Sequence, residues 1–222
     1  MSIETLANPQ DVRQARHAKN KVRRLHHHAL RTMDMEATRA FYEGILEMPL
    51  VGTWKEGFDP IKGKNSPYLH CFFELGDGSA MAFFLFKPGE REKPPLVPQD
   101  AYDHHISLHV GSVEDLIILR DRLREAGYKH AVMDHGYCYS IYTRDPNGLL
   151  VELTADPVNG LEIAEEAAEK ADAELQKWLD GDYSINNELR EIPTSVIPSS
   201  SPEDLLEIVS PDNWRARELL AR

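Results

Sequence analysis

The middle of the chain shows the same succession of hydrophobic and polar positions twice. Residues 27–31 and residues 105–109 read alike, His27 corresponding to His105 with an offset of 78 positions. In both places a short strand pattern leads to an Asp or Ser that can cap a helix, because its side chain accepts from the exposed N–H groups of the first turn. An internal repeat of this kind predicts two copies of one structural unit.

Each copy continues with an amphipathic helix and then with three strand-like runs. The runs span residues 50–54, 68–75 and 80–87 in the first copy and residues 129–133, 137–143 and 149–154 in the second. Each copy therefore has the order β-α-β-β-β, and because one such unit leaves a sheet face uncovered, we expect the two units to join. The predicted fold class is α+β: two paired βαβββ units form a curved eight-stranded mixed sheet, with helical extensions at both ends.

The two ends of the chain differ from the middle in charge. Residues 11–24 contain six basic residues and one acidic residue, whereas residues 157–222 contain 15 acidic and six basic residues. We therefore divide the chain into three parts. They are a basic, helical N-terminal extension (1–24), a central domain (25–156, with units at 25–88 and 103–156) and an acidic helical C-terminal extension (157–222).

The pattern of the C-terminal extension predicts helices. A narrow apolar stripe suited to close packing is formed by Ala164, Ala168, Ala171, Leu175 and Trp178. Residues 192–200 are Pro/Ser-rich, which predicts a linker or a strap across the surface. Two short helices are expected after it, because Ser201-Pro202 and Ser210-Pro211 each resemble a helix cap followed by its first residue.

The composition argues against several classes of function. The formal net charge of −12 argues against a nucleic-acid surface, which needs clustered Lys and Arg. No apolar run approaches the roughly 20 residues that cross a bilayer, and the first residues lack the apolar core of a signal peptide. Cys71 and Cys138 are the only cysteines, so a disulfide framework is excluded and a cytoplasmic location is expected.

Two histidines and one glutamate form the most informative set of polar residues. His27 and His105 occupy equivalent places in the two units, and Glu152 interrupts an otherwise apolar strand pattern. A carboxylate in such a strand is costly unless it is paired or binds a metal. Two His and one carboxylate leave open positions on an octahedral ion, an arrangement typical of non-haem Fe(II). The three residues together thus predict a metal site. Each of them alone would indicate no more than an ordinary residue of a strand.

The two units, with the sequence Asp145-Pro-Asn-Gly-Leu-Leu-Val-Glu152, resemble the vicinal oxygen chelate superfamily. That superfamily includes glyoxalase I, fosfomycin and bleomycin resistance proteins, methylmalonyl-CoA epimerase and extradiol ring-cleaving dioxygenases. The resemblance covers about residues 25–156. It implies metal ligands at His27, His105 and Glu152, in a cavity enclosed by the curved sheet.

Two features favour the extradiol dioxygenases within that superfamily. Glyoxalase-like members carry a second Glu in the first unit, and alignment of the two units puts Ala82 at that place. The segment from His135 through Tyr142 to Glu152 also resembles the extradiol signature, with Met133 as a departure. The resemblance implies that Tyr142 bonds the metal-bound substrate oxygen and that His135 orients the substrate. The alternatives are a core tyrosine and a solvent-exposed loop histidine.

Extradiol enzymes usually carry a further acid–base histidine near the end of the first unit, and here that place holds Ser79 or Ala80. His70 is expected opposite the position of Ser140, and it could relay protons instead, because its ordinary pKa lies near neutrality. The alternative for His70 is a cavity-lining residue.

The reading favoured by the sequence is Fe(II)-dependent extradiol cleavage of an aromatic diol by O2, in a homodimer. Two alternatives remain open. One is a glyoxalase-type lyase, isomerase or epimerase that uses Mn2+, Zn2+, Ni2+ or Co2+. The other is a small-molecule-binding protein of the resistance type, with no catalysis.

Overall fold

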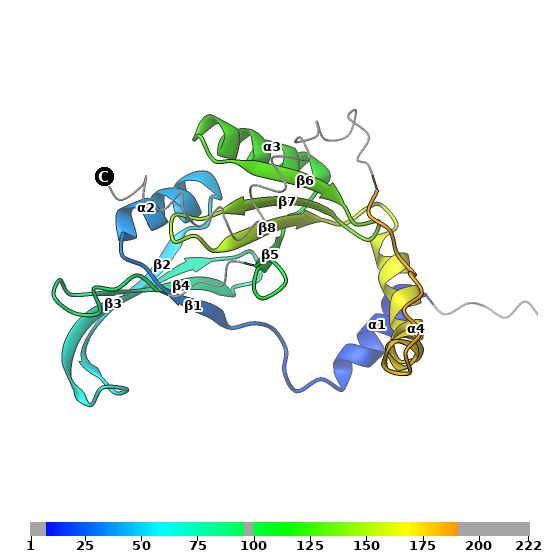
Figure 1. Cartoon of the computed structure of the whole chain (residues 1–222), viewed down its shortest axis with the longest axis horizontal. Helices are drawn as coiled ribbons and strands as arrows, with labels where there is room; N and C mark the ends of the chain where they lie inside the picture. The colour runs from blue at the N-terminus through cyan, green and yellow to red at the C-terminus, as the bar shows by residue number, and fades with distance from the viewer. Residues whose placement is uncertain (1–7, 96–99, 191–222) are drawn as a thin grey trace, which may run out of the picture.

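The computed structural model describes residues 8–95 and 100–190, and it contains two four-stranded mixed sheets (Figure 1). The strand orders are β1-β4-β3-β2 and β5-β8-β7-β6. The first sheet consists of β1 (His27–Arg31), β2 (Leu50–Asp59), β3 (Lys64–Glu74) and β4 (Ala80–Phe86). The second consists of β5 (Ile106–His109), β6 (His130–Asp134), β7 (Tyr139–Arg144) and β8 (Leu150–Ala155).

In each sheet one pair of neighbouring strands is parallel, β1 with β4 and β5 with β8. The other neighbouring strands are antiparallel. The helices follow the first strands. They are α2 (Met35–Arg39), which continues as the π-helical turn η1 (Ala40–Ile45), and α3 (Val113–Glu125). Asp34 and Ser112 cap them by accepting from Ala37 N–H and Asp115 N–H. The predicted βαβββ repeat and the α+β fold class are therefore confirmed. The eight predicted strands form two four-stranded sheets, one per unit, where the sequence analysis expected one continuous sheet.

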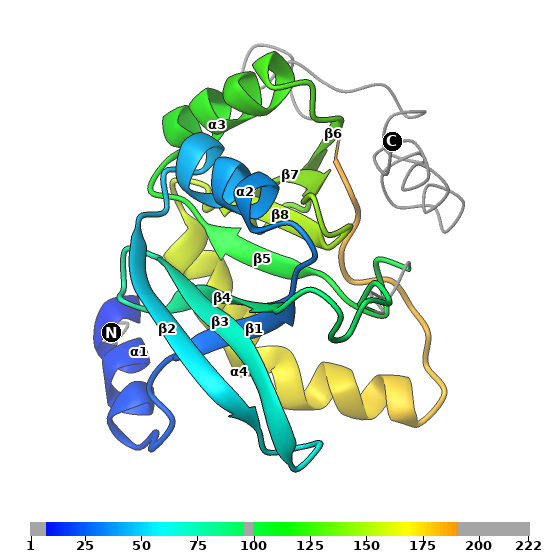
Figure 2. The same ribbon diagram turned by 90° about the vertical axis from the view of Figure 1, so that its left-hand side faces the viewer.

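The first unit departs from the expected boundaries in its central hairpin. β2 continues to Asp59, beyond the predicted run of residues 50–54. β3 begins at Lys64, before the predicted run of residues 68–75. Most residues of their outer halves are exposed, apart from the buried Asp59 and Ser66, and the tip projects from the body of the molecule (Figure 2). The Asp59 carboxylate holds the tip by accepting from Ile61 N–H and Lys62 N–H, and Gly63 adopts a φ of 63°. Hydrophobic alternation could not predict these residues, since the ribbon extends past the core.

One apolar core joins the two units through their helices. Phe41 and Tyr42 of η1 are fully buried, and Phe41 contacts Tyr128 of the second unit with ring centroids 5.1 Å apart. The Tyr42 hydroxyl donates to the carboxylate of Asp145 across the junction, at 3.1 Å. η1 and α3 lie close together in both views (Figures 1 and 2), and Arg122 of α3 donates to the Ile45 carbonyl.

The extensions form a helical pair at one end of the molecule. α1 (Pro9–Ala18) lies beside α4 (Gly160–Leu179), and the Arg16 guanidinium binds both carboxylate oxygens of Glu165 at 2.9 and 2.8 Å (Figure 1). The predicted apolar stripe of α4 is exposed in the single chain, since Leu175 and Trp178 are 59% and 57% accessible. No helix in residues 8–95 or 100–190 has the length and apolar character of a membrane span. The expected linker and the two short helices after residue 191 lie outside the described residues.

Candidate functional site

Strand register shows which positions of the two units are equivalent. Ala29 on β1 lies opposite Ala82 on β4, just as Ser107 on β5 lies opposite Glu152 on β8. Ala82 therefore occupies the place of Glu152, as the alignment of the two units predicted. The first unit offers no carboxylate at that point of its sheet.

The next pair of strands extends this equivalence. On the first sheet Phe72 lies opposite Ala82, and on the second Tyr142 lies opposite Glu152. The tyrosine that the sequence singled out thus has an aromatic counterpart without a hydroxyl. One unit presents a hydroxyl and a carboxylate side by side, and the other presents a phenyl ring and a methyl group.

Tyr142 connects the polar groups of the second unit. Its hydroxyl donates to Glu152 Oε1 at 2.7 Å and lies 2.9 Å from His135 Nε2. The hydroxyl has a single proton, which is directed to the carboxylate, so we infer that His135 carries its proton on Nε2 and donates it to the tyrosine oxygen. A chain of hydrogen bonds therefore runs from His135 through Tyr142 to Glu152.

Burial sets the protonation states of Tyr142 and His135 in this series of hydrogen bonds. It raises the pKa of the Tyr142 hydroxyl well above its ordinary value, and the bond to Glu152 adds to the shift. Burial also lowers the pKa of His135, against the opposing attraction of Glu152 and Asp134. At neutral pH Tyr142 is protonated and His135 is neutral, which agrees with the inferred direction of the hydrogen bonds.

His105 approaches the other oxygen of the same carboxylate. The ring lies just before β5, and its Nδ1 is 2.8 Å from the carbonyl oxygen of Ala101. That contact requires the proton on Nδ1, so in the neutral ring Nε2 carries a lone pair. This nitrogen lies 3.3 Å from Glu152 Oε2, and Glu152 is only 5% exposed.

The His105–Glu152 pair fits a divalent metal ion. Two acceptor atoms that face one another repel unless a cation or a proton lies between them. A metal bound at about 2.1 Å to each of two neighbouring positions separates its ligand atoms by about 3 Å, close to the observed spacing. The bonds from Ala101 and Tyr142 orient the two side chains in the way that outer partners orient metal ligands.

His27 and His70 lie together on the first sheet. Their ring centroids are 5.8 Å apart, and the His27 ring also contacts Phe72, at 5.4 Å. The Nδ1 atoms of His26 and His27 are 2.8 Å apart. His70 stacks on Phe84 with centroids 3.9 Å apart and an angle of 18°.

The environment of His70 is mainly apolar. Its Nε2 is buried without a hydrogen-bond partner, and burial, with His27 nearby, lowers its pKa. It pairs with Phe84 as Ser140 pairs with Thr154, so the expected equivalence of His70 and Ser140 is confirmed.

The structure thus brings His105, Glu152, Tyr142 and His135 together and places His27 and His70 in a separate group. In residues 8–95 and 100–190, no three His, Cys, Asp or Glu side chains are grouped so that they could hold a metal ion. Sequence reasoning missed two contacts to the site, the Ala101 carbonyl and Asn187, whose side chain donates to the His135 carbonyl. No motif marks either, because both contacts depend on how distant segments meet.

The fold is that of paired βαβββ units, and a family comparison agrees with it. Residues 24–153 match the family described as the Glyoxalase/Bleomycin resistance protein/Dioxygenase superfamily. This match covers more than half of the chain, so the protein belongs to that superfamily.

Several solved structures are similar to the chain at low identity. A lactoylglutathione lyase from Agrobacterium tumefaciens is 19% identical, covering 61% of this chain and 96% of its own, with a TM-score of 0.43. A fosfomycin resistance protein from Listeria monocytogenes, determined with Mn(II), is 20% identical and covers 62% and 96%, with a TM-score of 0.45. An oxidase, ChaP-H2, is 22% identical and covers 62% and 96%, with a TM-score of 0.43. No curated protein matches the chain.

Proposed function

We propose that the protein is an Fe(II)-dependent dioxygenase that cleaves the ring of a catecholic aromatic beside its two hydroxyl groups. The observation that supports this function is the carboxylate of Glu152. Tyr142 occupies one of its oxygens, and the other faces His105 Nε2 at 3.3 Å. The protein belongs to a superfamily that includes enzymes and binding proteins. The contacts of Glu152 with Tyr142 and His105 favour a metal-dependent enzyme among them.

His105 and Glu152 would hold the ion together with His27, which the structure of the single chain leaves in the separate group with His70. Iron, when bound, would join an aromatic diol and O2 at one centre and pass electron density between them. A fourth protein ligand would occupy one of the positions that the diol and O2 need. The methyl group of Ala82, at the place equivalent to Glu152, supplies none.

The chain's own residues would bind and orient the diol. The protonated Tyr142 hydroxyl would lie beside a substrate oxygen at the metal. His135 would hold that hydroxyl in place through its Nε2–H. On the first sheet, the rings of Phe72 and Phe84 offer an apolar wall for the substrate ring.

A base must accept a proton from the diol, and His70 is our candidate. Its lowered pKa keeps the imidazole neutral at pH 7, so one ring nitrogen can accept a proton. In the overall reaction the carbon–carbon bond next to the diol breaks and both atoms of O2 enter the product. The diol supplies all four electrons, and no further reductant is needed.

We propose that the working assembly is a homodimer. The exposed side chains of Leu175 and Trp178 on α4 support this, since clustered apolar groups at a surface mark interaction sites. Sedimentation is expected to give the mass of two chains, and the mass of one chain would contradict the proposal.

The function is tested by oxygen uptake. Protein purified without oxygen is loaded with Fe(II) and given catechol, and we expect one O2 consumed per ring opened, with both atoms of labelled O2 in the product. His109→Ala is the control, because His109 is exposed on β5 and pairs with Asp156 instead of Glu152. Retention of Mn2+, Zn2+, Ni2+ or Co2+ without oxygen uptake would point to a glyoxalase-type lyase or isomerase. A protein that binds no divalent metal would be a small-molecule-binding protein.

A further inference from the structure

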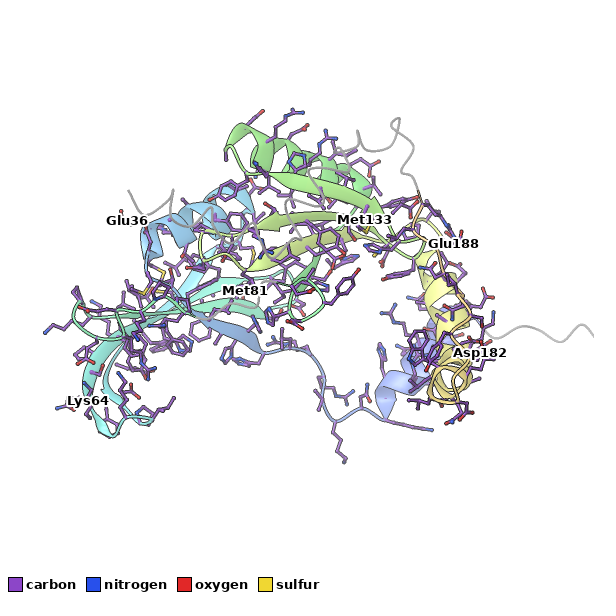
Figure 3. All side chains as sticks on the ribbon, viewed as in Figure 1. Glu36, Lys64, Met81, Met133, Asp182 and Glu188 are labelled. Carbon is purple, nitrogen blue, oxygen red and sulfur yellow. The ribbon has the colours of Figure 1, made fainter. Side chains whose placement is uncertain are left out.

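The segment after α4 returns to the second sheet and crosses the loop that carries His135. The Arg190 N–H donates to the Asp134 carbonyl at 2.9 Å, which forms an isolated antiparallel bridge at the end of β6. The side-chain amide of Asn187 donates to the His135 carbonyl at 3.0 Å. Figure 3 shows the same approach, with Glu188 of this segment near Met133 of β6.

The loop and the segment are in close contact at Gly136. A methyl group placed on Gly136 would lie 2.9–3.2 Å from the Cζ, Nη2 and Nε atoms of Arg190, which is tighter than nearly all real contacts of a methyl carbon. Gly136 also adopts a φ of 80°, in the left-handed region that favours glycine. The Arg190 guanidinium therefore covers the backbone of the loop directly.

The loop and the crossing segment together account for the backbone groups beside His135. Within the loop, Gly136 N–H donates to the Asp134 carboxylate at 2.6 Å and His135 N–H donates to the Cys138 carbonyl at 3.0 Å. The carbonyls of Asp134 and His135 point the other way and are bonded by the segment after α4. Without that segment, both carbonyls would have to find other donors.

The segment is itself attached to α4. Asn186 donates to Glu174 at 3.3 Å, and the rings of Trp178 and Tyr183 meet edge to face with centroids 4.7 Å apart. The crossing segment is thus connected to the helical pair at one end of the molecule and to the His135 loop at the other.

We propose that Asn187 and Arg190 are positioning residues for His135, and that the segment after α4, up to Arg190, serves the site by holding this loop. Their contacts fix the backbone on both sides of the imidazole, which places His135 Nε2 at 2.9 Å from the Tyr142 hydroxyl. The inference rests on the proposed function for its effect on catalysis. Displacement of a catalytic group by about 1 Å can lower a rate roughly 100-fold.

The test compares two neighbouring asparagines in the full chain. Asn187→Ala removes the bond to the loop, and Asn186→Ala removes a bond of the same type that points to α4. Hydrogen exchange of residues 133–139, followed by mass spectrometry, is expected to accelerate about tenfold in Asn187→Ala and in Arg190→Ala. The acceleration should be clearly smaller in Asn186→Ala, which loosens the attachment to α4 but retains the Asn187 bond to the loop.

Catechol turnover gives the second measurement. We expect Asn187→Ala to lower kcat about tenfold while KM changes less than about twofold, because the loop orients a group without holding the substrate. Asn187→Gln retains an N–H donor and should recover part of the rate, whereas Asn187→Asp, which lacks the donor, should not.

The outcomes separate this inference from the function it rests on. Unchanged exchange in Asn187→Ala overturns the inference, even if the wild-type protein cleaves catechol. Equal exchange and equal rates in the Asn186 and Asn187 variants overturn it as well. Faster exchange in a protein that shows no ring cleavage supports the hold on the loop and contradicts the proposed reaction.

Discussion

Where the second sheet presents Tyr142 beside Glu152, the first presents Phe72 beside Ala82 at the same register. On the second sheet the side chains are held by hydrogen bonds that run from His135 through Tyr142 to the carboxylate of Glu152. The aromatic side is ordered by ring contacts, such as the stacking of His70 on Phe84. A duplicated unit thus gives two similar frameworks, of which one carries a hydrogen-bonded tyrosine and carboxylate and the other an imidazole among aromatic rings. Identity of fold between the units does not extend to their chemistry.

The largest effect is expected when the carboxylate of the second unit is neutralised. Glu152→Gln retains the shape of the side chain and an acceptor for Tyr142, but it removes the negative charge that a metal ion needs. We expect iron binding to be lost and the rate to fall at least about 100-fold, measured as iron per chain and as oxygen uptake. A variant that retains iron and turnover would show that Glu152 is not a ligand.

A smaller effect is expected when the second unit is made to resemble the first. Tyr142→Phe removes the hydroxyl that joins His135 to Glu152, and kcat should fall about 10- to 100-fold while iron remains bound. Tyr139→Phe is the matched control, since Tyr139 lies on the same strand and packs against the apolar core. Similar losses of kcat in both variants would contradict the assignment of the hydroxyl to the site.

The turns before the last strands provide a comparison of stability. Asp145 is 4% exposed and accepts from Tyr42 and from the Leu149 N–H, whereas Asp77 of the first unit is exposed and accepts from the Ser79 N–H. Asp145→Ala should cost about 2–4 kcal/mol of unfolding free energy, because it leaves buried donors without a partner. Asp77→Ala should cost much less. Urea unfolding measures the free energy of unfolding of both variants. Equal losses of this free energy would mean that burial of the aspartate does not distinguish the two turns.

The sequence predicted the framework and much of the polar cluster. The repeat makes His27 equivalent to His105 and Ala82 equivalent to Glu152. Strand register confirms the second equivalence, because the alternation of side chains along a strand leaves little freedom in how two strands align. Tyr142 and Glu152 meet because they lie opposite one another on the neighbouring strands β7 and β8. His135 reaches Tyr142 from the loop that joins β6 to β7.

The remaining features depend on contacts that no local pattern encodes. Asn187 reaches the His135 carbonyl from a segment 52 positions away, and a polar residue in an irregular stretch gives no signal of such a partner. The length of the β2–β3 hairpin also escaped prediction, since its outer half buries no apolar face. The arrangement of His27 relative to His105 depends on how whole units meet, which spacing along the chain does not determine.

The measurement that tests the central claim most directly is the iron content of His27→Ala, prepared without oxygen beside wild-type protein and His109→Ala. The account predicts iron close to one ion per chain in the wild type and in His109→Ala, and a loss of most of that iron in His27→Ala. Full iron content in His27→Ala would contradict it, because the ion would then be held without the histidine of the first unit.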